Sequence, residues 1–124
     1  MRPCHVVITG GAGFIGSHLC ERYLRQGHRV TAVDSLVTGQ RTHVERLSAL
    51  GHFDFIEADI TRGLPSLAEV DVILHFASPA SPIDYQELPV ATMLTGSHGT
   101  QHALDTALEH GARFVLASTS EVYG

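Results

Sequence analysis

The stretch VVITGGAGFIGSHL, residues 6–19, limits the possible folds of this chain more than any other. It opens with apolar and β-branched residues at positions 6–9, a run typical of a buried parallel strand. Glycines follow at Gly10, Gly13 and Gly16. Beyond the turn, larger apolar side chains recur at helical spacing, at Ile15, Leu19 and Tyr23. We therefore expect a strand, a glycine turn and a helix within one βα unit.

This order of elements is the context that a dinucleotide-binding fingerprint requires. Gly10 would permit the tight turn out of the strand, Gly13 would let backbone N–H groups approach a pyrophosphate, and Gly16 would let the helix pack closely against the sheet. The N–H groups and the partial positive charge at the start of the helix favour phosphate at the same place. The alternative interpretation is a plain glycine-rich loop that binds nothing.

A carboxylate stands where such a fingerprint needs one. RVTAVD at residues 29–34 predicts a second strand ending in Asp34, about 20 residues beyond the glycine turn. A carboxylate there accepts hydrogen bonds from the adenosine ribose hydroxyls, and its charge repels a 2′-phosphate. Asp34 therefore favours NAD over NADP. The alternative is an exposed aspartate at the end of a strand.

Strands and helices alternate along the rest of the chain. We expect further strands at residues 53–59, 70–76 and 113–118, and helices at residues 40–50 and from 88 or 90 to 110. Residues 61–69 read as a loop with at most a short helix after Pro65. In the last helix one face is shared by Met93, Gly96, Thr100, Ala103 and Ala107.

This alternation predicts the α/β class, with one domain over residues 1–124. We expect a Rossmann-like, doubly wound parallel sheet of about five strands in the order 3-2-1-4-5. In such a sheet the ligand crevice lies at the carboxyl ends of strands 1 and 4, where the winding reverses.

Composition argues against several other classes. Hydrophobic residues make up 44% of the chain, charged residues 17%, and the formal net charge is −5, which disfavours nucleic acid as a partner. We expect no membrane span, because no run approaches ~20 apolar residues, and a cytoplasmic location, because no basic and apolar leader opens the chain. Of the nine histidines, only His98 and His102 have i,i+4 spacing on a helix, so no metal site is predicted.

Further motifs add to the glycine stretch. They are DSLVTG at 34–39, HFASPASPIDY at 75–85 and LASTSEVYG at 116–124. Together the motifs resemble the extended short-chain dehydrogenases/reductases, the NAD-dependent epimerases and dehydratases, over the whole chain. The ASPASP loop and the STSEVYG segment are most similar to the UDP-glucuronate decarboxylase branch. The related dTDP-glucose dehydratases usually carry an acidic residue where this chain has Ser120.

The resemblance implies NAD as the cofactor. The residues implied at its phosphates are Gly10, Gly13, Phe14, Ile15 and Gly16. Those implied at its adenosine half are Asp34, Ser35, Thr38 and Gly39, with Asp59 and Ile60 at the adenine. Those implied along the rest of the cofactor are Phe76, Ser78 and Thr95.

The resemblance also implies a UDP-sugar as substrate, oxidised at C4 before its carboxylate is lost. Contacts to this sugar nucleotide are implied for Pro79, Ser81 and Tyr85. Thr119 matches the family position whose hydroxyl bonds the reacting sugar oxygen, and Glu121 matches a carboxylate beside the sugar ring. The alternative for these two residues is a turn after a strand with a solvated acid.

The chain departs from the family pattern at its proton-transfer groups. The family's base is a Tyr followed four residues later by a Lys, and this chain has no lysine. We expect both groups, and the substrate-binding half, beyond position 124. In addition, Leu94 and Gly96 stand where decarboxylases usually have Lys and Asn. These changes would weaken a contact to an anionic substrate and a polar anchor near the sheet.

Three functional hypotheses remain from the sequence. The chain is the NAD-binding part of a nucleotide-sugar decarboxylase and inactive alone, or it is a non-catalytic module that binds dinucleotide or associates with itself. In the third hypothesis a partner chain supplies the Tyr and Lys to an epimerase or dehydratase. An uncovered fifth strand would expose an unpaired edge and apolar surface, so we also expect a homodimer or higher oligomer, built partly through the helix at 90–110.

Overall fold

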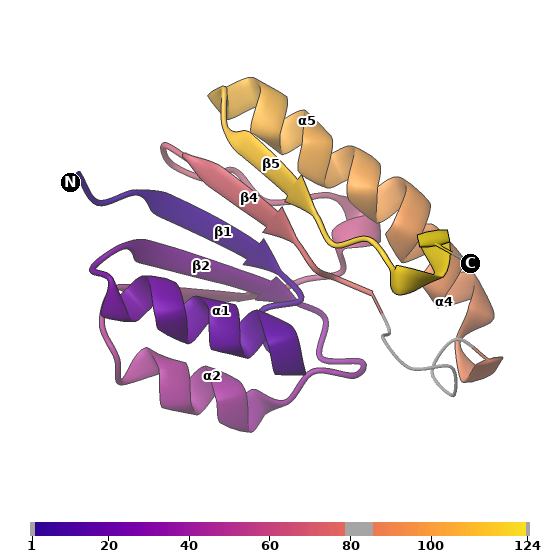
Figure 1. Cartoon of the computed structure of the whole chain (residues 1–124), viewed down its shortest axis with the longest axis horizontal. Coiled ribbons are helices and arrows are strands. Elements are labelled where there is room, and N and C mark those ends of the chain that lie inside the picture. Colours follow the sequence, from indigo (N-terminus) through magenta and orange to yellow (C-terminus); the bar gives the residue numbers. More distant parts are fainter. Residues whose placement is uncertain (1, 79–85, 124) are drawn as a thin grey trace.

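The computed structural model describes residues 2–78 and 86–123, and its centre is one parallel sheet (Figure 1). The strands are β1 (His5–Thr9), β2 (Arg29–Asp34), β3 (Phe53–Glu57), β4 (Val72–His75) and β5 (Arg113–Leu116). They pair in the order β3-β2-β1-β4-β5, and every pairing is parallel. The predicted fold class and strand order are confirmed.

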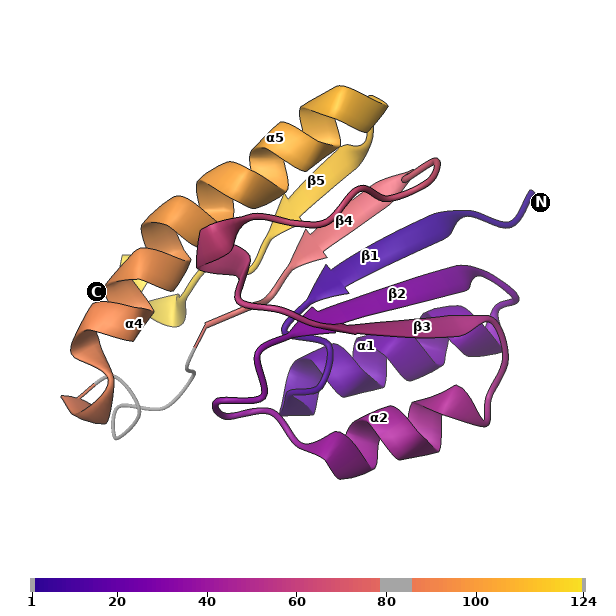
Figure 2. The same ribbon diagram turned by 180° about the vertical axis from the view of Figure 1, so that it is seen from behind.

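Helices cover both faces of the sheet (Figures 1 and 2). On one face lie α1 (Phe14–Arg25) and α2 (Arg41–Ser48). On the other lie α4 (Pro89–Leu94) and α5 (Thr100–His110). The side chains of β1 alternate between two cores, because successive residues of a strand point to opposite faces. Val6 and Ile8 pack with the α1 side, whereas Val7 packs with the α5 side.

Several elements are shorter than the sequence predicts. The strands expected to reach residues 59, 76 and 118 end at Glu57, His75 and Leu116, and the helix expected at 40–50 spans Arg41–Ser48. The fourth strand begins at Val72, two residues later than predicted, and the Val70 N–H donates to the ring of His110. The segment expected to be loop, with at most a short helix after Pro65, begins instead with a short helical turn at Ile60–Arg62, which the Asp59 side chain caps. At these last two places a side-chain contact replaces a ladder or helix bond.

The long helix is interrupted by a π-helical turn at Thr95–Gly99, between α4 and α5. A π turn contains extra backbone per turn, so it shifts the faces of the helix relative to one another. The predicted shared face is therefore wrong at its start. Met93 and Gly96 are exposed, and Gly99 instead lies buried in line with Ala103 and Ala107.

Gly99 explains how tightly this segment packs. A Cβ added to it would lie 2.8 Å from Cγ2 of Ile60, in the short turn beneath. The π turn thus brings the start of α5 into direct contact with the Ile60–Arg62 turn.

Candidate dinucleotide site

The glycine turn joins β1 to α1 at the middle of the sheet. Gly10 has a φ of +73°, which favours glycine, and a Cβ there would lie 2.6 Å from the carbonyl oxygen of Phe76. A Cβ on Gly16 would lie 2.1 Å from the Gly10 carbonyl oxygen. Gly16 therefore lets α1 approach the turn itself, whereas the sequence predicted close packing against the sheet. The glycine turn therefore lies where the sequence predicts it, and neighbouring backbone atoms leave no room for a side chain at Gly10 or Gly16.

The start of α1 presents backbone donors. Gly13 is the N-cap residue, and no side chain among the described residues caps the helix there. The first N–H groups of a helix have no partner within it, so those of Phe14, Ile15 and Gly16 point outward along the helix axis. Phe14 and Ile15 have exposed side chains, 75% and 56% accessible. Such an end suits an anion.

Asp34 lies directly beside this turn. Its Oδ2 accepts a hydrogen bond from the Ala12 N–H at 3.0 Å, and its Oδ1 accepts one from the Leu36 N–H at 2.8 Å. A Cβ on Gly39 would lie 2.8 Å from the same carboxylate, so the Ser35–Gly39 segment folds closely around it. The structure thus brings the predicted phosphate cradle and the predicted ribose carboxylate together, with Ser35 and Thr38 exposed on the connecting turn.

The turn after β2 also contains a strained residue that sequence reasoning missed. Leu36 has a φ of +64°, a left-handed conformation that costs a non-glycine residue of order 1 kcal/mol or more. Its N–H bond to Asp34 holds it there.

In the glycine turn after β1, sequence reasoning also missed Gly11. A Cβ on Gly11 would lie 2.5 Å from the Cβ of Ala32. Neither requirement is visible in local sequence, because both arise from tertiary contacts.

A chain of hydrogen-bonded polar groups lies at the carboxyl ends of β1 and β4, where the ligand crevice is predicted. The Thr9 Oγ1 accepts hydrogen bonds from the N–H groups of Phe76 and Ala77, at 3.1 and 3.2 Å. With both lone pairs used, it donates its own hydrogen to Nδ1 of His75, 2.7 Å away. Nε2 of His75 therefore carries the ring hydrogen and donates it to Thr100 Oγ1 at 3.1 Å. That hydroxyl donates to the Gly96 carbonyl of the π turn at 2.9 Å.

The chain of hydrogen bonds makes His75 a neutral residue. Its side chain is only 3% exposed, and this burial lowers the pKa of the imidazole below its usual value. Phe76, a predicted cofactor residue, is thus held by its own backbone, and Ser78 follows it at the exposed end of the segment. The network links β1, β4 and the π turn, which carries Thr95.

The remaining predicted cofactor residues lie on the α5 side. The Asp59 carboxylate accepts hydrogen bonds from the hydroxyl and the N–H of Thr61, at 2.7 and 3.0 Å, and these bonds lower its pKa. Ile60 is 5% exposed and buried against Gly99. Thr95 donates its hydroxyl to the Ala91 carbonyl at 2.8 Å. Their roles at the adenine and along the cofactor stay predictions.

The predicted substrate side is described only in part. Thr119 lies beyond the carboxyl end of β5, exposed, at the start of the short turn Ser120–Tyr123. The backbone of Glu121 belongs to that turn, and its side chain lies outside the described residues. Pro79, Ser81 and Tyr85 also lie outside the described residues.

Other kinds of site receive no support from the described residues. Across 2–78 and 86–123, no group of three or more His, Cys, Asp or Glu residues could hold a metal ion. His102 directs a ring nitrogen to the Thr61 carbonyl at 3.1 Å. The helices of this part of the chain are also too short or too polar to cross a bilayer.

The fold and this edge of the sheet define a class: an α/β domain whose glycine turn, at the switch point of a doubly wound sheet, lies beside a hydrogen-bonded aspartate. The close backbone contacts of Gly10 and Gly16 give this turn its shape, and the N–H groups at the start of α1 fit the phosphates of NAD. Residues 6–124 match the family described as the NAD dependent epimerase/dehydratase family. The chain belongs to this family, as its motifs predict.

Individual relatives agree with the decarboxylase resemblance. The chain is 47% identical over 119 residues to UDP-glucuronic acid decarboxylase 1 of Danio rerio, covering 96% of this chain and 28% of the relative. It is 44% identical over 119 residues to UDP-glucuronic acid decarboxylase 1 of Arabidopsis thaliana, covering 96% and 27%. The chain thus spans little more than a quarter of the length of these curated relatives.

Solved structures agree on the fold. The chain superposes on UDP-glucose-4-epimerase from Stenotrophomonas maltophila, solved with NAD and formylated UDP-arabinopyranose, with a TM-score of 0.81 and 31% identity, over 98% of this chain and 38% of that one. The UDP-glucose 4-epimerase of Thermus thermophilus, solved in complex with NAD, gives a TM-score of 0.73 and 30% identity, over 93% and 37%.

Proposed function

We propose that this chain forms the NAD-binding part of a nucleotide-sugar-modifying enzyme of the UDP-glucuronate decarboxylase type. One observation carries the proposal: the Asp34 carboxylate is hydrogen-bonded to the Ala12 N–H within the glycine turn. This contact supports a ribose-binding role for Asp34 beside a phosphate-binding turn. The 47% identity to a UDP-glucuronic acid decarboxylase over 96% of the chain supports the decarboxylase type of reaction.

Different residues of this chain would bind different parts of NAD. The N–H groups at the start of α1 would hold the pyrophosphate, and the free lone pairs of Asp34 would accept hydrogen bonds from the ribose. The backbone of Phe76, fixed by Thr9, would line the crevice towards the reacting end. Bound NAD supplies a two-electron oxidant for a sugar hydroxyl. Thr119 and Glu121, after β5, would face the sugar as polar groups.

The proton-transfer pair of the family is not among these 124 residues. Without lysine, the chain offers no group to lower the pKa of a tyrosine base in the family's manner. We expect a polypeptide of these residues to bind NAD and to leave UDP-glucuronate unconverted. A partner chain that supplies the Tyr and Lys would restore turnover, which is the third hypothesis from the sequence.

The test combines binding with turnover. Calorimetry of the 124-residue polypeptide should show one NAD site, with NADP bound more weakly. Incubation with UDP-glucuronate and NAD should yield no UDP-xylose. Absence of NAD binding would overturn the proposed function. Formation of UDP-xylose would overturn the expectation of inactivity and place the proton-transfer groups elsewhere in the chain.

Self-association is a second proposed property, favoured by a specific surface. Leu104 and Leu108 on the outer side of α5 are 41% and 80% exposed, and Val115 and Leu116 on the edge strand β5 are 41% and 52% exposed. Apolar surface of this kind favours an interface with a second copy or with further chain. Light scattering at working concentration should give a homodimer or larger species, and a monomer would contradict the proposal.

The cytoplasmic location expected from the sequence stays a prediction.

A further inference from the structure

Ala12 is held from both sides within the glycine turn. It is fully buried, and its N–H donates to Asp34 Oδ2 at 3.0 Å. Its carbonyl oxygen accepts two hydrogen bonds from the start of α2: one from the Gln40 N–H at 2.9 Å and one from the ring of His43 at 2.8 Å. Both polar groups of one backbone residue are therefore fixed by elements outside the turn.

The protonation of His43 follows from its partner. A carbonyl oxygen only accepts hydrogen bonds, so Nδ1 of His43 carries a hydrogen and donates it. The imidazole can do this both as the neutral Nδ1–H tautomer and as the cation. The side chain is half-buried between α2 and the turn. The contact therefore requires only a donor at the Nδ1 position.

Because the peptide bond between Ala12 and Gly13 is planar, the hydrogen bonds to the Ala12 carbonyl also affect Gly13. In a planar trans peptide the C=O of Ala12 and the N–H of Gly13 point in opposite directions. The two donors on the Ala12 oxygen therefore also set the direction of the Gly13 N–H, which donates to the Gly10 carbonyl at 3.1 Å. This bond closes the turn immediately before Phe14. Rotation of the same peptide would turn a carbonyl dipole towards the first turn of α1.

We propose that His43 is a positioning residue for the pyrophosphate-binding turn, acting through the Ala12 carbonyl. This inference rests on the proposed NAD function for its ligand, and on the Ala12 contacts for its geometry. It joins α2, an element with no predicted cofactor residue, to the cradle at the start of α1. The expected ligand effect is confined to compounds that carry a pyrophosphate.

The experiment compares His43→Leu, which removes the donor, with His43→Asn, whose Nδ2–H can occupy the place of the Nδ1–H. His52→Leu is the matched control, because His52 is exposed and lies before β3. We expect His43→Leu to weaken NAD and ADP binding about tenfold, the loss expected for one hydrogen bond, and to leave adenosine binding unchanged. His43→Asn should restore NAD and ADP affinity to within about threefold of the original chain.

A second readout needs no ligand. Amide hydrogen exchange of Gly13 should accelerate about tenfold in His43→Leu, or in the smaller truncation His43→Ala should Leu prevent folding, and return towards the original rate in His43→Asn. Unchanged Gly13 exchange together with unchanged ADP affinity in His43→Leu would overturn the inference. Equal weakening of adenosine and ADP would also overturn it, because the effect would not act through the pyrophosphate. Failure of the unmodified chain to bind NAD or ADP would overturn the proposed function, while Gly13 exchange would still test His43.

Discussion

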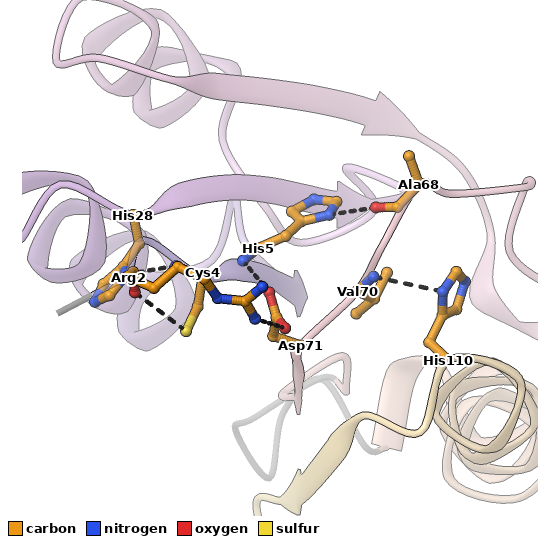
Figure 3. Close-up of polar contacts among 8 residues, drawn as sticks. All are labelled: Arg2, Cys4, His5, His28, Ala68, Val70, Asp71 and His110. Atoms are coloured by element: carbon orange, nitrogen blue, oxygen red, sulfur yellow. Dashed lines mark hydrogen bonds and ion pairs between the residues drawn. The ribbon is translucent and has the colours of Figure 1, made fainter.

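The two ends of the sheet differ in which backbone N–H groups they leave available to a ligand. At the amino end, side chains satisfy the backbone where strands begin (Figure 3). Asp71 accepts from the His5 N–H at 2.8 Å and from the Arg2 side chain at 3.0 Å, and the ring of His28 accepts from the Cys4 N–H at 3.0 Å. At the carboxyl end, the glycine turn leaves the first N–H groups of α1 directed outward.

This difference separates stability from binding. The amino end has its hydrogen-bonding capacity occupied by the protein itself: the ring of His5 bonds the Ala68 carbonyl at 2.8 Å and the Thr31 hydroxyl at 2.7 Å. The carboxyl end keeps donors and a carboxylate available beside one another. Substitutions at the first end should change the free energy of unfolding and leave cofactor affinity unchanged. Those at the glycine turn and Asp34, at the second end, should change cofactor affinity, whether or not they also change stability.

The largest expected effect is at the carboxyl end, for Gly16→Ala. The added Cβ would lie 2.1 Å from the Gly10 carbonyl oxygen, so the turn must open. We expect NADH fluorescence titration to detect no binding and the free energy of unfolding to fall by about 1–3 kcal/mol. Gly96→Ala is the control, because a Cβ there meets nothing within 4 Å. Unimpaired NADH binding by Gly16→Ala would contradict the close contact.

The matching change at the amino end is Asp71→Ala. It leaves the N–H of His5, a residue only 6% exposed, without its acceptor, so urea denaturation should show a loss of about 1–3 kcal/mol. NAD affinity should be unchanged. Asp54→Ala removes only an exposed ion pair with Arg29 and should cost less than about 1 kcal/mol. A change in NAD affinity in Asp71→Ala would contradict the idea that the amino end of the sheet affects stability alone.

A third prediction concerns cofactor choice at Asp34. Its charge should favour NAD over NADP by at least about tenfold, because a 2′-phosphate beside a carboxylate is repelled. Asp34→Asn should reduce this ratio, since the amide keeps one acceptor and loses the charge. Calorimetry with both cofactors measures the ratio for each chain. Tighter binding of NADP by the unmodified chain would show that Asp34 does not select the cofactor.

The smallest expected effect is the pH dependence contributed by His75. Burial lowers the pKa of its imidazole in the folded chain below the unfolded value of 6.5. The unfolded state therefore binds more protons as the pH falls through about 6.5, and the free energy of unfolding decreases until the pH passes below the folded pKa. His75→Asn should flatten this part of the curve. Urea denaturation between about pH 8 and pH 5 tests it, and equal slopes in both chains would contradict the prediction.

The sequence could predict the features that depend on local pattern. The strand, the glycine turn and α1 are visible because residue type and spacing determine them, and the strand order follows from the alternation of elements. Asp34 could be placed beside the turn because parallel strands β1 and β2 end at the same edge.

The rest depends on contacts between distant segments. The π turn, which moves Gly99 rather than Gly96 into the interior, follows from packing against Ile60. The contact of His43 with Ala12 spans 31 residues, and no spacing in the sequence indicates it. Polar residues that hold a site through the backbone are therefore missed more easily than residues that form a motif.

The position of β1 in the middle of the sheet has a consequence during synthesis. Val6 pairs with Val30 on one side and with Val72 on the other, so β1 is completed by a strand 66 residues later. At about 5–20 residues per second, ribosomes would leave this apolar strand without at least one of its two partner strands for roughly 3–13 s. Until β4 is made, a newborn chain thus exposes its most buried strand, and early contacts with a chaperone would fall on the residues that lead into the glycine turn.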